Sequence, residues 1–194
     1  MLRGQLISLE GACGQRLKPA AKHVLDSFCR NQEGGISYWN ASGIFTDMRL
    51  QDPNIATPSP RTLLLLYAAD LAFRLHWEIR PALEQGQCVV AAPYIHTAIA
   101  FGKAAGVQRR WMLQLFRFAP QPDACCQTVS DGVLGNTDDS QPLDGYIEFC
   151  YEALRGPSSP WGPEFQGRFR AYLAALERRG RCLTVSPQML PSEQ

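Results

Sequence analysis

The chain has 194 residues, of which 45% are hydrophobic and 19% charged. These values are typical of one globular domain and exclude a disordered chain. The net charge of +1 predicts no nucleic acid and no membrane as partner, and the longest apolar run, Leu63–Ala69, is too short to span a bilayer. The first residues lead directly into a strand-like run instead of an apolar leader, so we expect a cytoplasmic protein. We expect one domain over residues 1–185 and a flexible tail over 186–194.

A strand-like run and a glycine turn open the chain. The run Gln5–Leu9 is followed by Glu-Gly-Ala-Cys-Gly and then by a helical pattern, the context in which backbone N–H groups bind phosphate. The phosphate-loop pattern G-x-x-x-x-G-K-[ST], counted from Gly11, nevertheless fails. Arg16, Leu17 and Lys18 stand where Gly, Lys and Ser or Thr are required. The sequence therefore predicts the scaffold of a phosphate loop without its lysine and its metal-binding hydroxyl.

Five short apolar or β-branched runs recur along the chain, and helical patterns separate most of them. The runs are Leu6–Leu9, Ile36–Trp39, Cys88–Ala92, Ala124–Val129 and Cys182–Val185. Strands and helices that alternate at this spacing indicate parallel strands with helical crossovers. We expect an α/β fold, a three-layer sandwich with a mainly parallel sheet of about five strands.

Three helices carry start or stop signals. The first is predicted to begin near Pro19. The second has Ser59 as a candidate N-cap and Pro60 at its first position, and its leucines surround most of the helix, which predicts burial between neighbours. Pro81 should kink or restart this helix. The last helix is predicted over Glu164–Arg179. Its apolar face consists of Phe165, Phe169, Tyr172, Leu173 and Leu176.

Seven cysteines are scattered along the chain without a C-x-x-C pair, and three histidines show no ligand pattern, so we predict no metal site. The cysteines are Cys13, Cys29, Cys88, Cys125, Cys126, Cys150 and Cys182. Several lie in apolar runs, which favours buried free thiols in a reducing compartment. Cys125 and Cys126 are neighbours in a strand and point to opposite faces, so they are poor candidates for a mutual disulfide.

The segment 129–145 has the weakest structural pattern. It contains Asp131, Asp138, Asp139 and Asp144, and no Lys or Arg lies between Arg117 and Arg155. A loop of this length is usually functional or mobile. It could dock a basic partner surface, and the alternative is a solvated loop.

Several segments together carry a family resemblance. They are Leu6–Gly14, Leu63–Asp70, Ile79–Ala92, Tyr94–Ala100 and Phe165–Tyr172. These segments resemble parts of the thymidylate kinase family, a branch of the P-loop nucleoside monophosphate kinases. In chain order, they correspond to the family's first strand and loop, its nucleotide-lining helix, its helix, turn and third strand, the next short helix, and its late helix. The resemblance implies a P-loop fold, phosphoryl transfer from ATP to dTMP, and a homodimer formed through helices that flank the sheet.

The chain departs from this family where the family holds phosphate and metal. The departing residues are Cys13, Leu17, Lys18, Leu71 and Ala92-Pro93, which replace a loop Asp, the phosphate Lys, a metal-binding Ser or Thr, an Arg and an Asp-Arg pair. A basic lid is also missing from the segment between Arg117 and Arg155. One lost charge contact of this kind costs roughly 3–4 kcal/mol of transition-state stabilisation. We therefore expect impaired catalysis, and we predict no catalytic residue and no metal ligand.

The candidate nucleotide-binding residues are the positions where the family pattern survives or could be rearranged. They are Gly11, Gly14, Arg16, Lys18, Tyr67, Asp70 and Tyr94. The glycines could form an anion-binding turn or an ordinary tight turn. The two cations could reach a phosphate or be solvated, and Tyr67 could stack on a base or pack in the core. Asp70 could contact the base or cap a helix, and packing is the favoured role of Tyr94.

Three functions stay open on these observations. The first is a nucleotide-binding or regulatory pseudokinase with a degenerate phosphate loop and no certain cofactor. The second is an active nucleoside monophosphate kinase that uses Arg16 and Lys18 in a rearranged loop and requires Mg-ATP. The third is a structural, partner-binding protein without a ligand.

Overall fold

The computed structural model describes residues 4–11, 14–29, 32–44, 58–128, 163–178 and 183–185. The predicted acidic loop at 129–145 and the predicted tail at 186–194 lie outside the described residues. Both stay predictions, and so does the domain boundary at residue 185.

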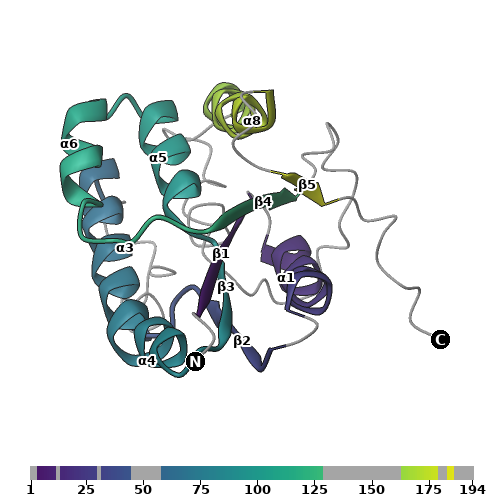
Figure 1. The fold of residues 1–194 in the computed structure, drawn as a ribbon. Coiled ribbons are helices and arrows are strands. Elements are labelled where there is room, and N and C mark those ends of the chain that lie inside the picture. The colour runs from purple at the N-terminus through teal and green to yellow at the C-terminus, as the bar shows by residue number, and fades with distance from the viewer. Residues whose placement is uncertain are drawn as a thin grey trace.

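Five parallel strands form one sheet, which confirms the predicted α/β class (Figure 1). The strands are β1 (Gln5–Glu10), β2 (Gly34–Tyr38), β3 (Cys88–Ala92), β4 (Ala124–Thr128) and β5 (Leu183–Val185). Their order across the sheet is β2-β3-β1-β4-β5, and each neighbouring pair is parallel. The first strand therefore lies in the centre, and the chain crosses to one side for β2 and β3 and to the other for β4 and β5.

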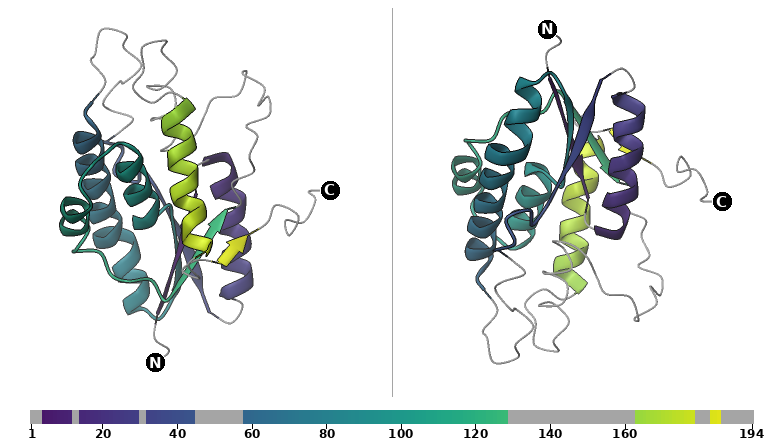
Figure 2. Two further views of the ribbon diagram at one scale, coloured as in Figure 1. Left: turned by 90° about the horizontal axis from the view of Figure 1, so that it is seen from above. Right: turned by 90° about the horizontal axis from the view of Figure 1, so that it is seen from below.

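Helices cover both faces of this sheet (Figure 2). They are α1 (Gly14–Phe28), α3 (Pro60–Arg74), the π-helical turn η1 (Leu75–Ile79), α4 (Arg80–Glu84), α5 (Ile95–Ala104), α6 (Arg109–Leu115) and α8 (Pro163–Arg178). Helix α1 packs on one face, and α3, α5 and α8 pack on the other. Side chains of β1 alternate between the two faces of the sheet and contribute to both cores. Ile7 and Leu9 pack in the core with α1, whereas Leu6 packs in the core with α3 and α5.

Helix α1 begins five residues before the predicted start near Pro19, which lies inside the helix. The prediction was wrong because the buried stripe of Leu17, Ala20, Ala21 and Val24 already fixes the helix from its first turn. Tertiary packing of that stripe outweighs the one backbone hydrogen bond that Pro19 cannot donate.

Helix α3 begins where the sequence predicts, but it is less buried than predicted. Ser59 Oγ accepts a hydrogen bond from Thr62 N at 3.1 Å, and Pro60 occupies the first turn, as predicted. The predicted burial of the helix between neighbours is wrong on one face, since Leu65, Phe73 and Trp77 are 51%, 39% and 66% exposed. The chain passes Pro81 through η1 into α4, so that the proline restarts a helix as expected.

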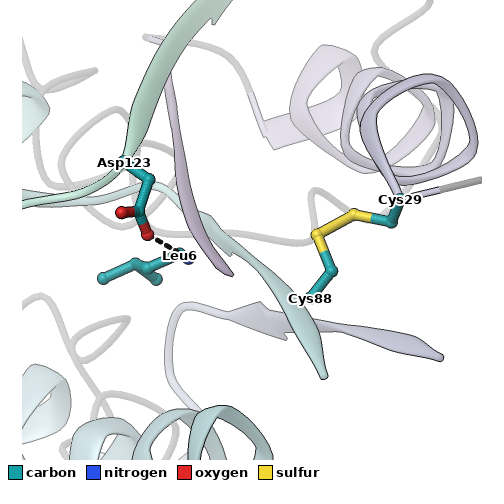
Figure 3. Close-up of a disulfide and its surroundings, with 4 residues drawn as sticks. All are labelled: Leu6, Cys29, Cys88 and Asp123. Atoms are coloured by element: carbon teal, nitrogen blue, oxygen red, sulfur yellow. Dashed lines mark hydrogen bonds between the residues drawn. A yellow bond between two sulfur atoms is a disulfide. The ribbon is translucent and has the colours of Figure 1, made fainter. Parts of the chain in front are cut away.

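Two of the free thiols predicted from the sequence form a disulfide, Cys29–Cys88, with a Cα–Cα separation of 5.9 Å (Figure 3). Cys125 is also disulfide-bonded, whereas Cys126 is free and buried. The prediction failed because the pairing depends on where the end of α1 crosses the start of β3, which spacing along the chain does not reveal. Disulfides persist mainly in oxidising surroundings, so the predicted reducing compartment loses its support.

Helix α8 packs against α5 and buries Phe165, Phe169 and Leu173, three residues of the predicted apolar face. Tyr172 instead lies 39% exposed, with the Lys103 ammonium 5.5 Å from its ring centroid. Among the helices of the described residues, none has the length and apolar character needed to cross a membrane.

Candidate functional site

The carboxyl ends of the central strands meet at one edge of the sheet. Glu10 ends β1 and Gly11 follows it, while Trp39 follows β2, Tyr94 follows β3, and Thr128 ends β4. The chain runs from β1 to opposite sides of the sheet, and open parallel sheets bind their ligands at such a crossing point. This edge is therefore the candidate site.

A buried carboxylate occupies the centre of this edge. Glu10 is fully buried, and its Oε2 accepts hydrogen bonds from Tyr94 N at 3.2 Å, Thr97 N at 2.9 Å and Thr97 Oγ1 at 2.6 Å. Its Oε1 accepts from His96 N at 3.2 Å. These amides belong to the start of α5, whose dipole favours a negative charge there. The Glu10 carboxylate thus occupies the position at the N-terminus of α5 where an external anion would otherwise bind.

Sequence reasoning missed Glu10. The available signal was an acidic residue at the end of an otherwise apolar strand, directly before the glycine turn. A carboxylate in such a place needs several donors to offset its burial, and the sequence does not show where they come from.

Gly11 is closely surrounded by other atoms, and its amide already has a hydrogen-bond partner. Its amide donates to Thr97 Oγ1 at 3.2 Å. A Cβ at this residue would lie 2.4 Å from Thr128 Oγ1 and 3.2 Å from Leu17 Cδ2, so only glycine fits. Leu17, at the position where the family resemblance expects a lysine, is 4% exposed and belongs to the α1 core.

Arg16 and Lys18 are the two cations that the sequence predicts near this turn. Gly14 and Arg16 lie in the first turn of α1, and the side chain of Arg16 lies outside the described part of the structure. Lys18 is exposed, and its carbonyl accepts a hydrogen bond from the Tyr38 hydroxyl at 3.1 Å. Burial raises the pKa of Tyr38, and the positive charge of Lys18 partly opposes this increase. The Lys18 ammonium therefore acts near the end of β2.

Tyr67 is a fully buried ring with aromatic neighbours. Trp39 stacks on it with a centroid distance of 5.0 Å and an interplanar angle of 22°, and Phe116 meets it edge-on at 5.9 Å. Its hydroxyl lies within hydrogen-bonding distance of the carbonyls of Tyr94 at 2.7 Å and Pro93 at 3.1 Å. Burial raises the pKa of Tyr67 well above its usual value, which keeps the hydroxyl a donor. Stacking of Tyr67 on a base stays a prediction, and one ring face is taken by Trp39.

Asp70 holds the turn that follows β2. Its Oδ2 accepts from Asn40 N at 3.0 Å, and its Oδ1 accepts from Ser42 N at 3.0 Å and Ser42 Oγ at 2.7 Å. Asn40 has a φ of 59°, a left-handed conformation that asparagine tolerates better than most residues. The buried carboxylate thus anchors a turn, a role that neither sequence alternative described.

Arg74 is a fully buried cation that sequence reasoning also missed. It donates from Nε to Ser37 Oγ at 2.9 Å, from Nη2 to Ser37 O at 2.7 Å, and from Nη1 to Pro93 O at 3.1 Å. Ser37 Oγ in turn donates to Glu78 Oε2 at 2.6 Å. Arg74 therefore ties the ends of β2 and β3 to α3, one turn beyond Leu71, and no local pattern distinguishes it from a solvated arginine.

Tyr94 completes the buried edge. Besides the bond from its amide to Glu10, its hydroxyl donates to Pro120 O at 2.9 Å. Burial raises the pKa of Tyr94 far above its usual range. Its ring packs in the core with α3 and α5, in agreement with the packing role favoured from the sequence.

Comparison with known proteins finds relatives that are probable thymidylate kinases. The chain is 42% identical over 59 residues to a probable thymidylate kinase of Thermococcus gammatolerans, which covers 30% of this chain and 28% of that protein. It is 27% identical over 122 residues to probable thymidylate kinase 2 of Saccharolobus solfataricus, covering 63% of this chain and 57% of that protein. The crystal structure of thymidylate kinase from Ehrlichia chaffeensis superposes with a TM-score of 0.60 over 95% of this chain and 87% of that one, at 16% identity.

The chain is thus similar to thymidylate kinases in part of its sequence and in its fold. The sequence matches span 28% to 57% of these two relatives' own lengths, and the structural likeness shows the fold. No protein-family model matches the chain. Within the described residues, no group of three or more His, Cys, Asp or Glu side chains could hold a metal ion.

Proposed function

We propose that this chain is a nucleotide-binding or regulatory member of the thymidylate kinase family that transfers no phosphoryl group from ATP. The observation that carries the proposal is the burial of Leu17. This apolar side chain of α1 is 4% exposed and packs toward the sheet, so it can supply neither charge nor hydrogen bond to a triphosphate at the glycine turn.

The neighbouring groups support the same conclusion. The Gly11 amide is bonded to Thr97 Oγ1, and the Glu10 carboxylate occupies the start of α5, so both are committed within the protein. A negative charge at that point opposes the approach of another anion. These residues do not fit Mg-ATP, and we derive no reaction step through it.

An anionic ligand could still bind beside the end of β2. There Lys18 is exposed, and the Tyr38 hydroxyl lies next to its backbone. A cation and a hydroxyl at the carboxyl edge of a parallel sheet suit a phosphate monoester such as dTMP, the substrate class that the relatives' names suggest.

Calorimetric titration tests this proposal with dTMP, and with ATP in the presence and absence of Mg²⁺. We expect dTMP to bind without metal and ATP to show no magnesium-dependent binding. Lys18→Ala should weaken dTMP binding, whereas Lys22→Ala, an exposed lysine on the same helix, should not. Magnesium-dependent ATP binding that Lys18→Ala abolishes would refute the proposal and support the active-kinase alternative.

We also propose that the chain forms a homodimer through the outer face of α3 and η1. Leu65, Phe73 and Trp77 lie on this face at helical spacing, and all three are exposed. Phe73 and Trp77 contact each other, with ring centroids 6.5 Å apart. Light scattering after size-exclusion chromatography should give a dimer for the wild-type protein and a monomer for Trp77→Glu. A wild-type monomer would contradict the proposal.

A further inference from the structure

We propose that the outer face of α6 is a docking surface for anionic phospholipid membranes. What we call the α6 face consists of the exposed residues Arg109, Arg110 and Leu113 of α6, together with Arg117 and Phe118 of the turn that follows the helix. The proposal goes beyond the nucleotide site, which lies at the carboxyl edge of the sheet. We propose peripheral binding of the protein to the membrane surface, and no helix crosses the bilayer in this proposal.

The α6 face is positively charged, and no acidic side chain stands beside it in the sequence of residues 85–122. No Asp or Glu occurs between Glu84 and Asp123, so that α5, α6 and the turn between them lack acidic side chains. The three arginines of the α6 face are exposed, and within residues 58–128 none of them forms an ion pair. The net charge of +1 for the whole chain conceals this local excess.

Exposed apolar side chains lie among these arginines. Leu113 and Phe118 are 43% and 40% exposed, and Leu113 stands one turn from Arg109 and Arg110 and about one turn from Arg117. The phosphate backbone of a nucleic acid could pair with the arginines, but it would leave the exposed leucine and phenylalanine in water. A lipid interface receives both, because headgroup phosphates meet the arginines while acyl chains meet the leucine and the phenylalanine. This combination favours a membrane over a nucleic acid.

The core side of α6 holds the face in place. Met112 is fully buried, and a Cβ added at Gly102 of α5 would lie 2.2 Å from its sulfur, so the two helices approach closely. Trp111 joins α6 to α3, with the Arg61 guanidinium 5.8 Å from its ring centroid. Figure 1 shows α6 at the edge of the ribbon, on the other side of the sheet from α1.

Co-sedimentation with phosphatidylcholine vesicles, prepared with and without phosphatidylserine, tests the proposal. We expect binding only to the vesicles that contain phosphatidylserine, and weaker binding as salt is raised. Each cation near an anionic membrane strengthens binding by roughly fivefold, so Arg110→Glu/Arg117→Glu should weaken it by about thirtyfold or more. Leu113→Ser/Phe118→Ser should weaken it by roughly tenfold through lost apolar insertion.

A charge-matched control separates the α6 face from total charge. Lys22→Glu/Arg80→Glu changes the net charge equally at exposed sites on α1 and α4 and should leave vesicle binding near the wild-type level. Because all substituted side chains of the α6 face are exposed, the melting temperature should stay unchanged and report any misfolding. Equal binding to neutral vesicles, equal loss in the control variant, or α6-dependent binding to duplex DNA in place of vesicles would overturn the proposal.

Discussion

The disulfide Cys29–Cys88 should account for a large part of the stability of this fold. It joins residues 59 apart, and the closed loop contains β2, α3, η1 and α4. A cross-link over a loop of this length removes about 14 cal/mol/K of entropy from the unfolded chain, which corresponds to about 4 kcal/mol at 25 °C. Replacing both residues, Cys29→Ala/Cys88→Ala, should therefore lower the free energy of unfolding by roughly 3–4 kcal/mol.

Urea denaturation of both proteins, without reductant, measures this difference. The slope of unfolding free energy against urea should also be larger in the variant, because its unfolded chain is less compact. Cys126→Ala provides the control, since Cys126 is a free and buried cysteine. A loss below about 1 kcal/mol, or alkylation of Cys29 and Cys88 in the unreduced, denatured wild-type protein, would contradict a stabilising role of this disulfide.

Three further predictions concern the buried polar groups. Glu10→Gln should lower the unfolding free energy by about 3 kcal/mol, because an NH₂ group then faces the N–H donors of α5; the exposed Glu84→Gln should have little effect in the same urea titration. Arg74→Met should cost about 3–5 kcal/mol by thermal or urea unfolding, since it leaves Ser37 and a buried carbonyl without their donor, and a cost under about 1 kcal/mol would contradict the assigned contacts. Burial raises the pKa of Cys126 from 9.0 to about 11, so the folded state keeps the thiol protonated. The unfolded thiol ionises first, and stability should fall as the pH rises from 9.0 towards 11 in the wild-type protein but not in Cys126→Ala, as followed by urea midpoints.

Local patterns predicted the framework of this protein. The strand at Cys88–Ala92 is found with its predicted bounds, and Ser59 caps α3 as expected. Both features depend on residues that are neighbours in the chain, namely an apolar run bounded by turns and a hydroxyl followed by proline. Where packing competes with a local signal, as at Pro19, the buried stripe of α1 determines where the helix begins.

The contacts at the candidate site could not be predicted in this way. Glu10 finds its donors 84 to 87 residues away, and Asp70 binds a turn about 30 residues earlier. Arg74 reaches two strand ends that only the folded sheet brings together. The same holds for Cys29 and Cys88, which local spacing left as free thiols. Long-range pairing gives these polar groups their partners, and the sequence carries no local mark of it.

The proposed loss of phosphoryl transfer is tested most directly by following product formation from ATP and dTMP in the presence of Mg²⁺. Purified protein is incubated with radiolabelled ATP, and labelled dTDP is separated by chromatography and compared with a protein-free control. We predict no product above that control, because Leu17 is buried and the Gly11 amide is bonded to Thr97. Steady formation of labelled dTDP that scales with protein concentration and disappears in Lys18→Ala would contradict it.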